Sequence, residues 1–145
     1  MKKILVIHGL GMNMRGKTQT ATFGRLTLSD YDDAINKYAS QLDLSVEIFH
    51  SNIDGEVINR IYQAFDENIS AILINPAGYT LSHPGLVTAI AQSGLPTFEV
   101  HISNPALRGT VSEIAKVAKG TITGFGVLGY FLAMQGILAE ISDDA

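Results

Sequence analysis

Short runs of apolar residues alternate along the chain with segments whose apolar residues recur at helical spacing. A continuous run such as Ile4-Leu5-Val6-Ile7 is typical of a strand covered on both faces of a sheet. The pattern predicts strands at residues 4–7, 45–49, 71–74, 97–100 and 121–123. It predicts helices at residues 29–42, 56–65, 84–94 and 127–141, with a weaker helical pattern over 111–118.

Residues at the predicted helix ends support these boundaries. Ser29 is a typical N-cap for the first helix, and the acidic residues that follow suit the positive end of its dipole. His83-Pro84 places a proline in the first turn of the third helix, and Gly94 is a typical end signal.

Strands that are each followed by helical sequence indicate βαβ units and a parallel sheet. Because crossovers between parallel strands are right-handed, the helices should cover both faces of that sheet. We therefore expect an α/β, three-layer, flavodoxin-like fold with a five-stranded sheet in the order 2-1-3-4-5, and one domain over residues 1–145.

The composition narrows the class of protein. The chain has 145 residues, no cysteine and a formal net charge of -4. These values exclude a disulfide scaffold and cysteine-ligated metals, and they argue against binding to a phosphate backbone. Residues 120–139 carry no charge, but their glycines and a strand-like Thr121-Ile122-Thr123 favour a buried strand and helix over a membrane span. We expect a soluble cytoplasmic protein without a nucleic-acid or membrane partner.

Polar residues collect where three predicted strands end. Asn13 follows the first strand, Asn75 ends the third, and Glu99 and His101 lie at the end of the fourth. In an open parallel sheet, ligands bind beyond the carboxyl ends of the strands, near the point where strand order reverses. We therefore expect these segments to form one site.

Glu99 and His101 are two residues apart on a strand, so their side chains share a face. A carboxylate beside an imidazole supports general acid or base chemistry, although the same spacing suits a purely structural pair. Asn75 can orient a substrate hydroxyl or stabilise a turn. The backbone amides of Ile102 and Ser103 can receive a carboxylate. Together they predict a small, anionic, hydroxylated ligand.

Two further patterns have simpler interpretations. Gly124-Phe125-Gly126-Val127-Leu128-Gly129 matches a dinucleotide motif, but a following strand with an acidic residue about twenty residues on is missing. The chain instead reaches Asp143 and Asp144, which we expect to form a tail, so these glycines indicate close strand–helix packing. The histidines fall at the ends of different elements, and only His8 and His101 could meet. We predict no metal and no cofactor.

Six separated motifs occur in order along the chain. They are Asn13-x-x-Gly16, Thr27-Leu28, Ser51-Asn52-x-Asp54-Gly55-Glu56, Ile74-Asn75-Pro76-x-x-Tyr79-Thr80, Glu99-Val100-His101-x-Ser103-Asn104 and Gly124-Phe125-Gly126-x-x-Gly129-Tyr130. In this order they resemble the type II 3-dehydroquinate dehydratases, over residues 3–135. The resemblance implies a lyase, and a homo-oligomer that is commonly a dodecamer built from trimers.

The resemblance also implies a mechanism. In that family a tyrosinate on the loop after the first strand, activated by an arginine, removes a proton beside a ketone, and an enolate forms. A histidine held by a glutamate then protonates the departing hydroxyl. By resemblance His101 would be the general acid, Glu99 its partner and Asn75 the residue that orients substrate and water. Asn13 would organise the loop.

The remaining implied contacts concern substrate binding. By resemblance the amides of Ile102 and Ser103 would hold the substrate carboxylate. Arg108 and His83 would bind other parts of a small cyclic hydroxy-keto carboxylate.

The loop departs from the family pattern. Phe23 stands where the base tyrosine belongs, Thr18 where its arginine belongs, and Leu81 where a hydroxyl-binding histidine belongs. Three hypotheses stay open: a slow 3-dehydroquinate dehydratase with Lys17 or Tyr79 as substitute base, a diverged enzyme for a different small hydroxylated acid, or a catalytically silent metabolite-binding homologue.

Overall fold

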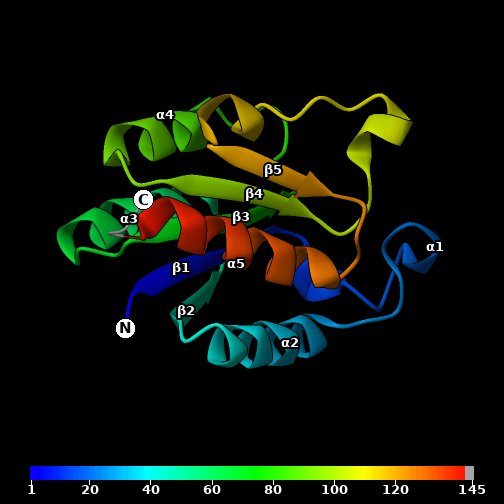
Figure 1. The fold of residues 1–145 in the computed structure, drawn as a ribbon. Helices are drawn as coiled ribbons and strands as arrows, with labels where there is room; N and C mark the ends of the chain where they lie inside the picture. The colour runs from blue at the N-terminus through cyan, green and yellow to red at the C-terminus, as the bar shows by residue number, and fades with distance from the viewer. Residues whose placement is uncertain (143–145) are drawn as a thin grey trace.

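The computed structural model describes residues 1–142, and the tail predicted at Asp143 and Asp144 lies outside the described residues. Five parallel strands form one sheet in the order β2-β1-β3-β4-β5, as predicted (Figure 1). The strands are β1 (Lys3–Leu10), β2 (Ser45–His50), β3 (Ala71–Ala77), β4 (Thr97–His101) and β5 (Gly120–Thr123). The helices are α1 (Thr20–Phe23), α2 (Leu28–Gln41), α3 (Asp54–Asp66), α4 (Pro84–Ser93) and α5 (Leu128–Ile141). Short 3-10 turns are η1 (Met12–Met14), η2 (Pro105–Arg108) and η3 (Ile114–Val117).

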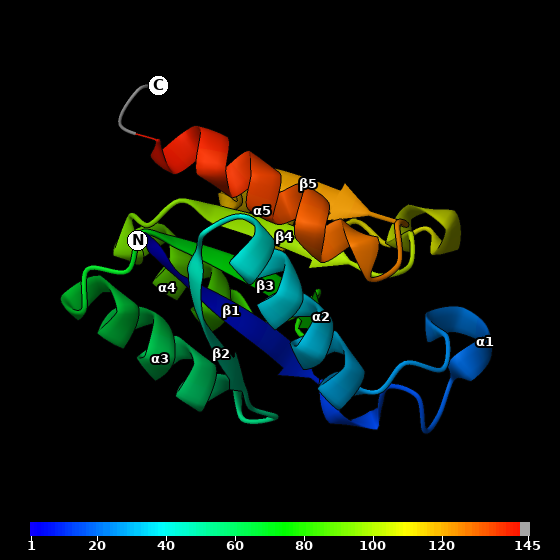
Figure 2. The ribbon, with the colours of Figure 1, turned by 60° about the horizontal axis from the view of Figure 1, so that its bottom comes forward.

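The sheet lies between two helical layers, α2 with α5 on one face and α3 with α4 on the other (Figures 1 and 2). Because side chains alternate along a strand, β1 serves both layers. Ile4 and Val6 pack with α2 and α5, while Leu5 and Ile7 pack with α3 and α4. All four side chains are fully buried, which explains the continuous apolar run in the sequence.

The predicted end residues are confirmed for α4 and are wrong at the start of α2. Pro84 begins α4 and Gly94 ends it in the left-handed region at φ 65°, as predicted. The prediction that Ser29 caps α2 was wrong, because the N-cap is Thr27. Its hydroxyl accepts a hydrogen bond from the Asp30 amide at 3.2 Å, and the Asp30 carboxylate accepts one from the Thr27 amide at 2.9 Å. This reciprocal pair satisfies two amides at once.

The segment 111–118 does not form the predicted helix. Only η3 (Ile114–Val117) is helical there, as a single 3-10 turn. The hydroxyl of Ser112 accepts a hydrogen bond from the Ile114 amide at 3.2 Å and itself donates to Glu99 on β4. These hydrogen bonds hold the segment against the sheet, and the helical turn does not extend beyond η3.

The uncharged residues 120–139 divide between β5 and α5, as predicted. Gly129 shows the close packing expected of its motif, since a Cβ added there would lie 3.1 Å from Val100 Cγ2. Within residues 1–142, no helix has both the length and the apolar character needed to cross a membrane.

Candidate functional site

A cavity of about 480 Å³ lies at the carboxyl ends of β1, β3 and β4, where the sequence predicts a site. The loop after β1, with α1, and the turn η2 complete its walls. Among the described lining residues, the titratable side chains are Arg15, His101 and Arg108, and there is no aspartate, glutamate or lysine. This lining favours an anionic ligand.

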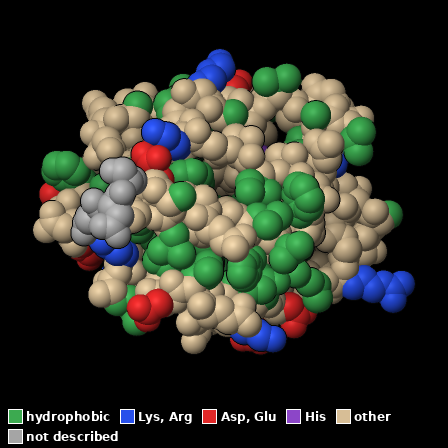
Figure 3. All heavy atoms as spheres, in the orientation of Figure 1, with side chains coloured by type: hydrophobic (Ala, Val, Ile, Leu, Met, Phe, Trp, Pro, Cys, Tyr) green, Lys and Arg blue, Asp and Glu red, His purple; other side chains and the backbone are tan. Residues whose placement is uncertain are grey.

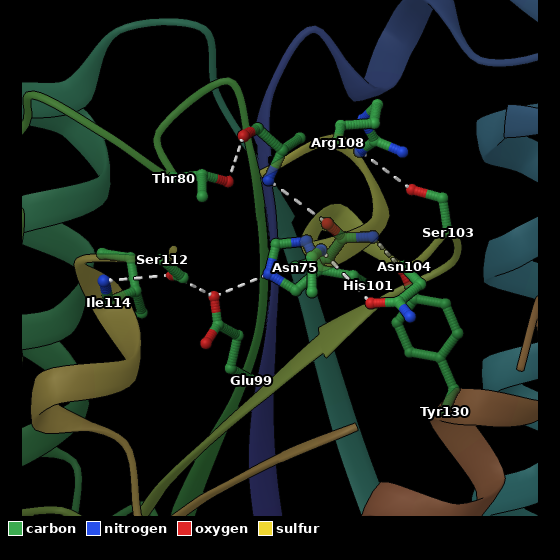
Figure 4. A network of polar contacts seen from close by, with 12 residues as sticks. Asn75, Thr80, Glu99, His101, Ser103, Asn104, Arg108, Ser112, Ile114 and Tyr130 are labelled. Carbon is green, nitrogen blue, oxygen red and sulfur yellow. Dashed lines mark hydrogen bonds and ion pairs between the residues drawn. The ribbon is translucent and has the colours of Figure 1, made fainter. Parts of the chain in front are cut away.

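The end of β4 holds a buried carboxylate–imidazole pair. The Nε2 atom of His101 lies 2.6 Å from Oε2 of Glu99, and the two residues are 7% and 1% exposed. Ser112 donates a second hydrogen bond to the same oxygen at 2.5 Å (Figure 4). Because Glu99 fixes Nε2, the other ring nitrogen is left to exchange a proton with a ligand. The pair predicted from strand spacing is thus formed at the cavity.

Asn75 lines the cavity from the end of β3, and both ends of its amide are held. Its Nδ2 donates to the hydroxyl of Tyr130 on α5 at 3.1 Å, and its Oδ1 accepts from the Ala77 amide at 3.2 Å (Figure 4). Burial raises the pKa of Tyr130 well above its ordinary value, against a smaller opposite effect of the Asn75 hydrogen bond. The Tyr130 hydroxyl therefore stays neutral and orients Asn75.

The loop after β4 brings Ile102, Ser103 and Arg108 to the same cavity. Asn104 begins the turn η2 by accepting a hydrogen bond from the Ala106 amide at 3.2 Å. At the end of this turn, Arg108 Nη2 donates to the hydroxyl of Ser103 at 3.2 Å. The loop thus presents a cation beside the amides expected to bind a carboxylate.

Asn13 organises the loop after β1 from outside the cavity. It lies on η1, exposed, and its Oδ1 accepts a hydrogen bond from Asn52 at 3.1 Å. Asn52 in turn accepts from the Gly11 amide at 2.9 Å. Gly16 closes the turn at φ 80°, where a Cβ would lie 2.7 Å from the carbonyl oxygen of Arg25. Asn13 does not line the cavity, so any effect on a ligand passes through the loop.

Phe23 lines the cavity where the family pattern places a tyrosine, and two guanidinium groups face its ring. The Cζ atoms of Arg15 and Arg108 lie 3.7 Å and 5.7 Å from the ring centroid. Arg15 is only 9% exposed. Burial lowers the pKa of Arg15, and the charge of Arg108 acts in the same direction, while Tyr31 and Tyr130 oppose it. An arginine nevertheless stays protonated at neutral pH.

The proposed substitute bases do not reach the cavity. Lys17 is exposed on the loop and is not part of the lining, in contrast to its neighbour Thr18. Tyr79 is 1% exposed and donates its hydroxyl hydrogen bond to the Ser51 carbonyl at 2.9 Å. Burial, followed by the charges of Asp54 and Glu56, raises the pKa of Tyr79. Neither residue is placed to remove a proton from a ligand there.

Two other histidines lie elsewhere. His83 was expected to bind substrate, but it is the N-cap residue of α4 and is not part of the cavity lining, whereas Leu81 is. Its Nδ1 lies 3.3 Å from an Asp54 oxygen. His8 does not meet His101; its Nε2 lies 2.8 Å from Asp32 Oδ1 on α2. In the part of the chain that the structure describes, no group of three or more metal-ligating side chains is found.

Sequence reasoning missed three contributions to this site. Ser112 holds Glu99, Tyr130 holds Asn75, and Arg15 packs on Phe23. Tyr130 closes the last of the six motifs, and that was a usable signal. Ser112 and Glu99 lie on different segments, and Arg15 and Phe23 lie on one loop without a regular sequence pattern, so neither contact had a local signal.

Fold and site together define a flavodoxin-like α/β protein with an acid–base pair in a cation-lined cavity at the reversal point of its sheet. A family model, Dehydroquinase class II, matches residues 2–138. The chain belongs to this family of dehydroquinases, which confirms the resemblance seen in its motifs.

Relatives agree with this assignment along nearly the whole chain. The chain is 42% identical over 140 residues to a 3-dehydroquinate dehydratase of Caldanaerobacter subterraneus subsp. tengcongensis, with 94% of each covered. It is 42% identical over 137 residues to that of Syntrophotalea carbinolica, with 92% of this chain and 93% of the relative covered. These relatives are lyases, which supports an enzymatic function.

Solved structures show the same architecture. The type II dehydroquinase of Propionibacterium acnes superimposes with a TM-score of 0.90 at 30% identity, covering 96% of this chain and 97% of that one. A 3-dehydroquinate dehydratase-like protein from Bifidobacterium longum superimposes with a TM-score of 0.75 at 29% identity, covering 99% and 100%.

Proposed function

We propose that this chain is a dehydratase that removes water from a small cyclic hydroxy-keto carboxylate of the 3-dehydroquinate type. The observation that carries the proposal is the buried Glu99–His101 pair at the same cavity as Asn75 and the residues Ile102 and Ser103. The family and its 3-dehydroquinate dehydratase relatives support the substrate class.

His101 acts as the general acid in this proposal. The protonated imidazole gives its proton to the departing hydroxyl, so that the leaving group is water. Glu99, 2.6 Å away, stabilises the imidazolium, and Ser112 keeps the carboxylate oxygen in place. Glu99 and Ser112 are positioning residues, because they act through His101.

Substrate binding involves the loop after β4 and the end of β3. The amides of Ile102 and Ser103 receive the carboxylate, and Arg108, bonded to the Ser103 side chain, adds a positive charge beside them. Asn75, held by Tyr130, orients a hydroxyl of the substrate. Asn13 contributes by keeping the loop after β1 in place through Asn52.

Among the described residues, the cavity lining has no side chain suited to removing the proton beside the ketone. Phe23 cannot accept a proton, and the part of the lining that the structure describes offers only arginines and His101 as titratable groups, so the proton beside the ketone passes to water in the open cavity. Loss of a positioned base typically costs a factor of roughly 10² to 10⁴ in rate. We therefore expect slow turnover of 3-dehydroquinate. The presence of Phe23 in place of a base also favours a second candidate function, in which a different small hydroxylated acid is bound or converted.

The test is the appearance of the conjugated enone product from 3-dehydroquinate, followed by absorbance with purified protein. We expect a slow reaction that His101→Gln lowers by at least about 100-fold. Thermal unfolding of the variant checks that it is folded. A rate equal to buffer alone, or a rate that His101→Gln leaves unchanged, would refute the proposed function and leave the different-acid candidate.

We also propose that the chain assembles as a homo-oligomer built from trimers, as the family resemblance implies. Exposed apolar side chains support an interface, among them Leu107 at 85%, Val111 at 79% and Phe125 at 58% exposure. Hydrophobic side chains also gather on the face that carries α5 (Figure 3). Light scattering after size-exclusion chromatography tests this, and a monomer at micromolar concentration would contradict it. The cytoplasmic location expected from the sequence is a separate proposal.

A further inference from the structure

One corner of the cavity contains two residues, Arg15 and Phe23, that have no role in the chemistry proposed above. It is formed by Arg15, Phe23 and Arg108, all of which line the cavity. Both guanidinium carbons lie within 6 Å of the Phe23 ring, at 3.7 and 5.7 Å from its centroid. Both cations therefore border the part of the cavity next to the Phe23 ring.

Arg15 is a buried cation without a polar partner. It is 9% exposed, and none of the hydrogen bonds or ion pairs found among residues 1–142 involves the Arg15 side chain. Its Nε atom is fully buried and unpaired. The face of Phe23 gives it a cation–π contact, but a phenyl ring accepts no conventional hydrogen bond. Buried cations are normally paired, so the missing acceptor points to a ligand.

No carboxylate of the described residues supplies that acceptor, and the buried hydroxyl of Tyr31, which opposes the lowering of the Arg15 pKa by burial, makes no hydrogen bond to it. The cavity lining has no carboxylate among the described residues, and Glu99 is already engaged by His101 and Ser112. Arg108 adds a second positive charge, since its Nη2 bonds only the neutral hydroxyl of Ser103. Arg15 and Arg108 repel each other as like charges, and an anion bound next to both would reduce this repulsion.

We propose that Arg15 and Arg108 form a second anion subsite beside Phe23, so that the cavity prefers a small cyclic acid with a second acidic group over one with a single carboxylate, such as 3-dehydroquinate. This inference rests on the proposed function, because the first acidic group occupies the amides of Ile102 and Ser103. Arg15 is then a specificity-determining residue for the second group. A cavity of about 480 Å³ accommodates one ring with two carboxylates.

The experiment compares two probes that differ only in charge at one end. They are cis-cyclohexane-1,3-dicarboxylate and its monoamide, 3-carbamoylcyclohexanecarboxylate, each titrated calorimetrically into the full chain. A charge-assisted bidentate contact predicts that the dicarboxylate binds about 10- to 100-fold more tightly than the monoamide. Raising the salt concentration should reduce this ratio.

Variants test whether Arg15 and Arg108 cause the preference for the dicarboxylate over the monoamide. Arg15→Met should bring the two affinities within about threefold, chiefly by weakening binding of the dicarboxylate, since one carboxylate of each probe still binds the amides. Arg25→Met, on an exposed arginine of the same loop, is the matched control and should keep the preference. If Arg15→Met does not fold, Arg108→Gln at the exposed side of the corner should still reduce the ratio several-fold.

Three outcomes would overturn the inference. They are equal binding of both probes, no binding of either at millimolar concentration, and a preference that survives both Arg15→Met and Arg108→Gln. A preference abolished by these variants, in a protein that gives no enone from 3-dehydroquinate, would refute the proposed function and leave the dianion subsite standing.

Discussion

Phe23→Tyr adds a hydroxyl at the position where a base is missing. The Phe23 ring faces the cavity, and the guanidinium of Arg15 lies 3.7 Å from its centroid. The variant therefore places a phenol beside a buried cation and close to bound substrate. We expect it to raise the rate of 3-dehydroquinate dehydration.

The expected magnitude follows from the geometry at Arg15. A phenol oxygen on this ring would lie about 5 Å from the guanidinium carbon, where a unit charge pair at an effective dielectric constant of about 20 is worth about 3 kcal/mol. That favours the phenolate by about a hundredfold, less whatever solvent in the open cavity screens. A positioned base contributes roughly 10²- to 10⁴-fold, so we expect a gain of at least about 10² in kcat.

The assay follows enone absorbance for the wild type, Phe23→Tyr and the double variant Phe23→Tyr/Arg15→Met. Phe65→Tyr is the matched control, because Phe65 is 59% exposed on α3, away from the cavity. Phe65→Tyr should leave the rate unchanged, and the double variant should lose most of the gain. A Phe23→Tyr rate within threefold of the wild type, in a folded variant, would refute the expectation that a phenolate at this position removes the substrate proton.

The other predictions concern the groups that hold the acid and the fold. Glu99→Gln should lower kcat by at least about tenfold with little change in KM, because Glu99 acts through His101, while Glu140→Gln on the surface should change neither. Ser112→Ala should give a smaller decrease in kcat of the same kind, and an increase confined to KM would contradict its role as a support for Glu99. Tyr130→Phe leaves the buried Asn75 amide without its acceptor and should cost about 1–3 kcal/mol in urea unfolding, whereas Tyr38→Phe should stay within about 0.5 kcal/mol. Burial and the charge of His8 lower the pKa of His50, against opposing effects of Asn52, Gly9 and Asp32. The unfolded chain therefore takes up a proton there first, so the free energy of unfolding should fall as pH drops through about 6.5, and His50→Gln should flatten that decrease.

Much of the architecture was predictable because its causes are local. A continuous apolar run such as residues 4–7 is buried on both faces, and the strand period alone puts Glu99 and His101 side by side. Proline and glycine at the ends of α4 restrict the backbone wherever they occur. The weak pattern over 111–118 failed because a side-chain contact with another element outweighed local preference.

The site itself was predictable only in part. The acid half follows from one strand, so its residues were found from sequence spacing. Lys17 and Tyr79 are close along the chain to cavity residues, but the fold turns Lys17 to solvent and fixes the Tyr79 hydroxyl on Ser51. His83 is likewise close along the chain to cavity residues, but its side chain pairs with Asp54 on α3.

What the sequence determined by itself was the order of strands and helices, the position of the site at one edge of the sheet, and the absence of a tyrosine at position 23. Tertiary structure alone decided which side chains meet there. Asn75 and Tyr130 are 55 residues apart, and Ser112 reaches Glu99 across 13. Arg15 becomes a buried, unpaired cation only when its loop folds back over Phe23. Backbone periodicity carries information over a few residues, whereas such contacts depend on how distant segments are brought together by the folded sheet.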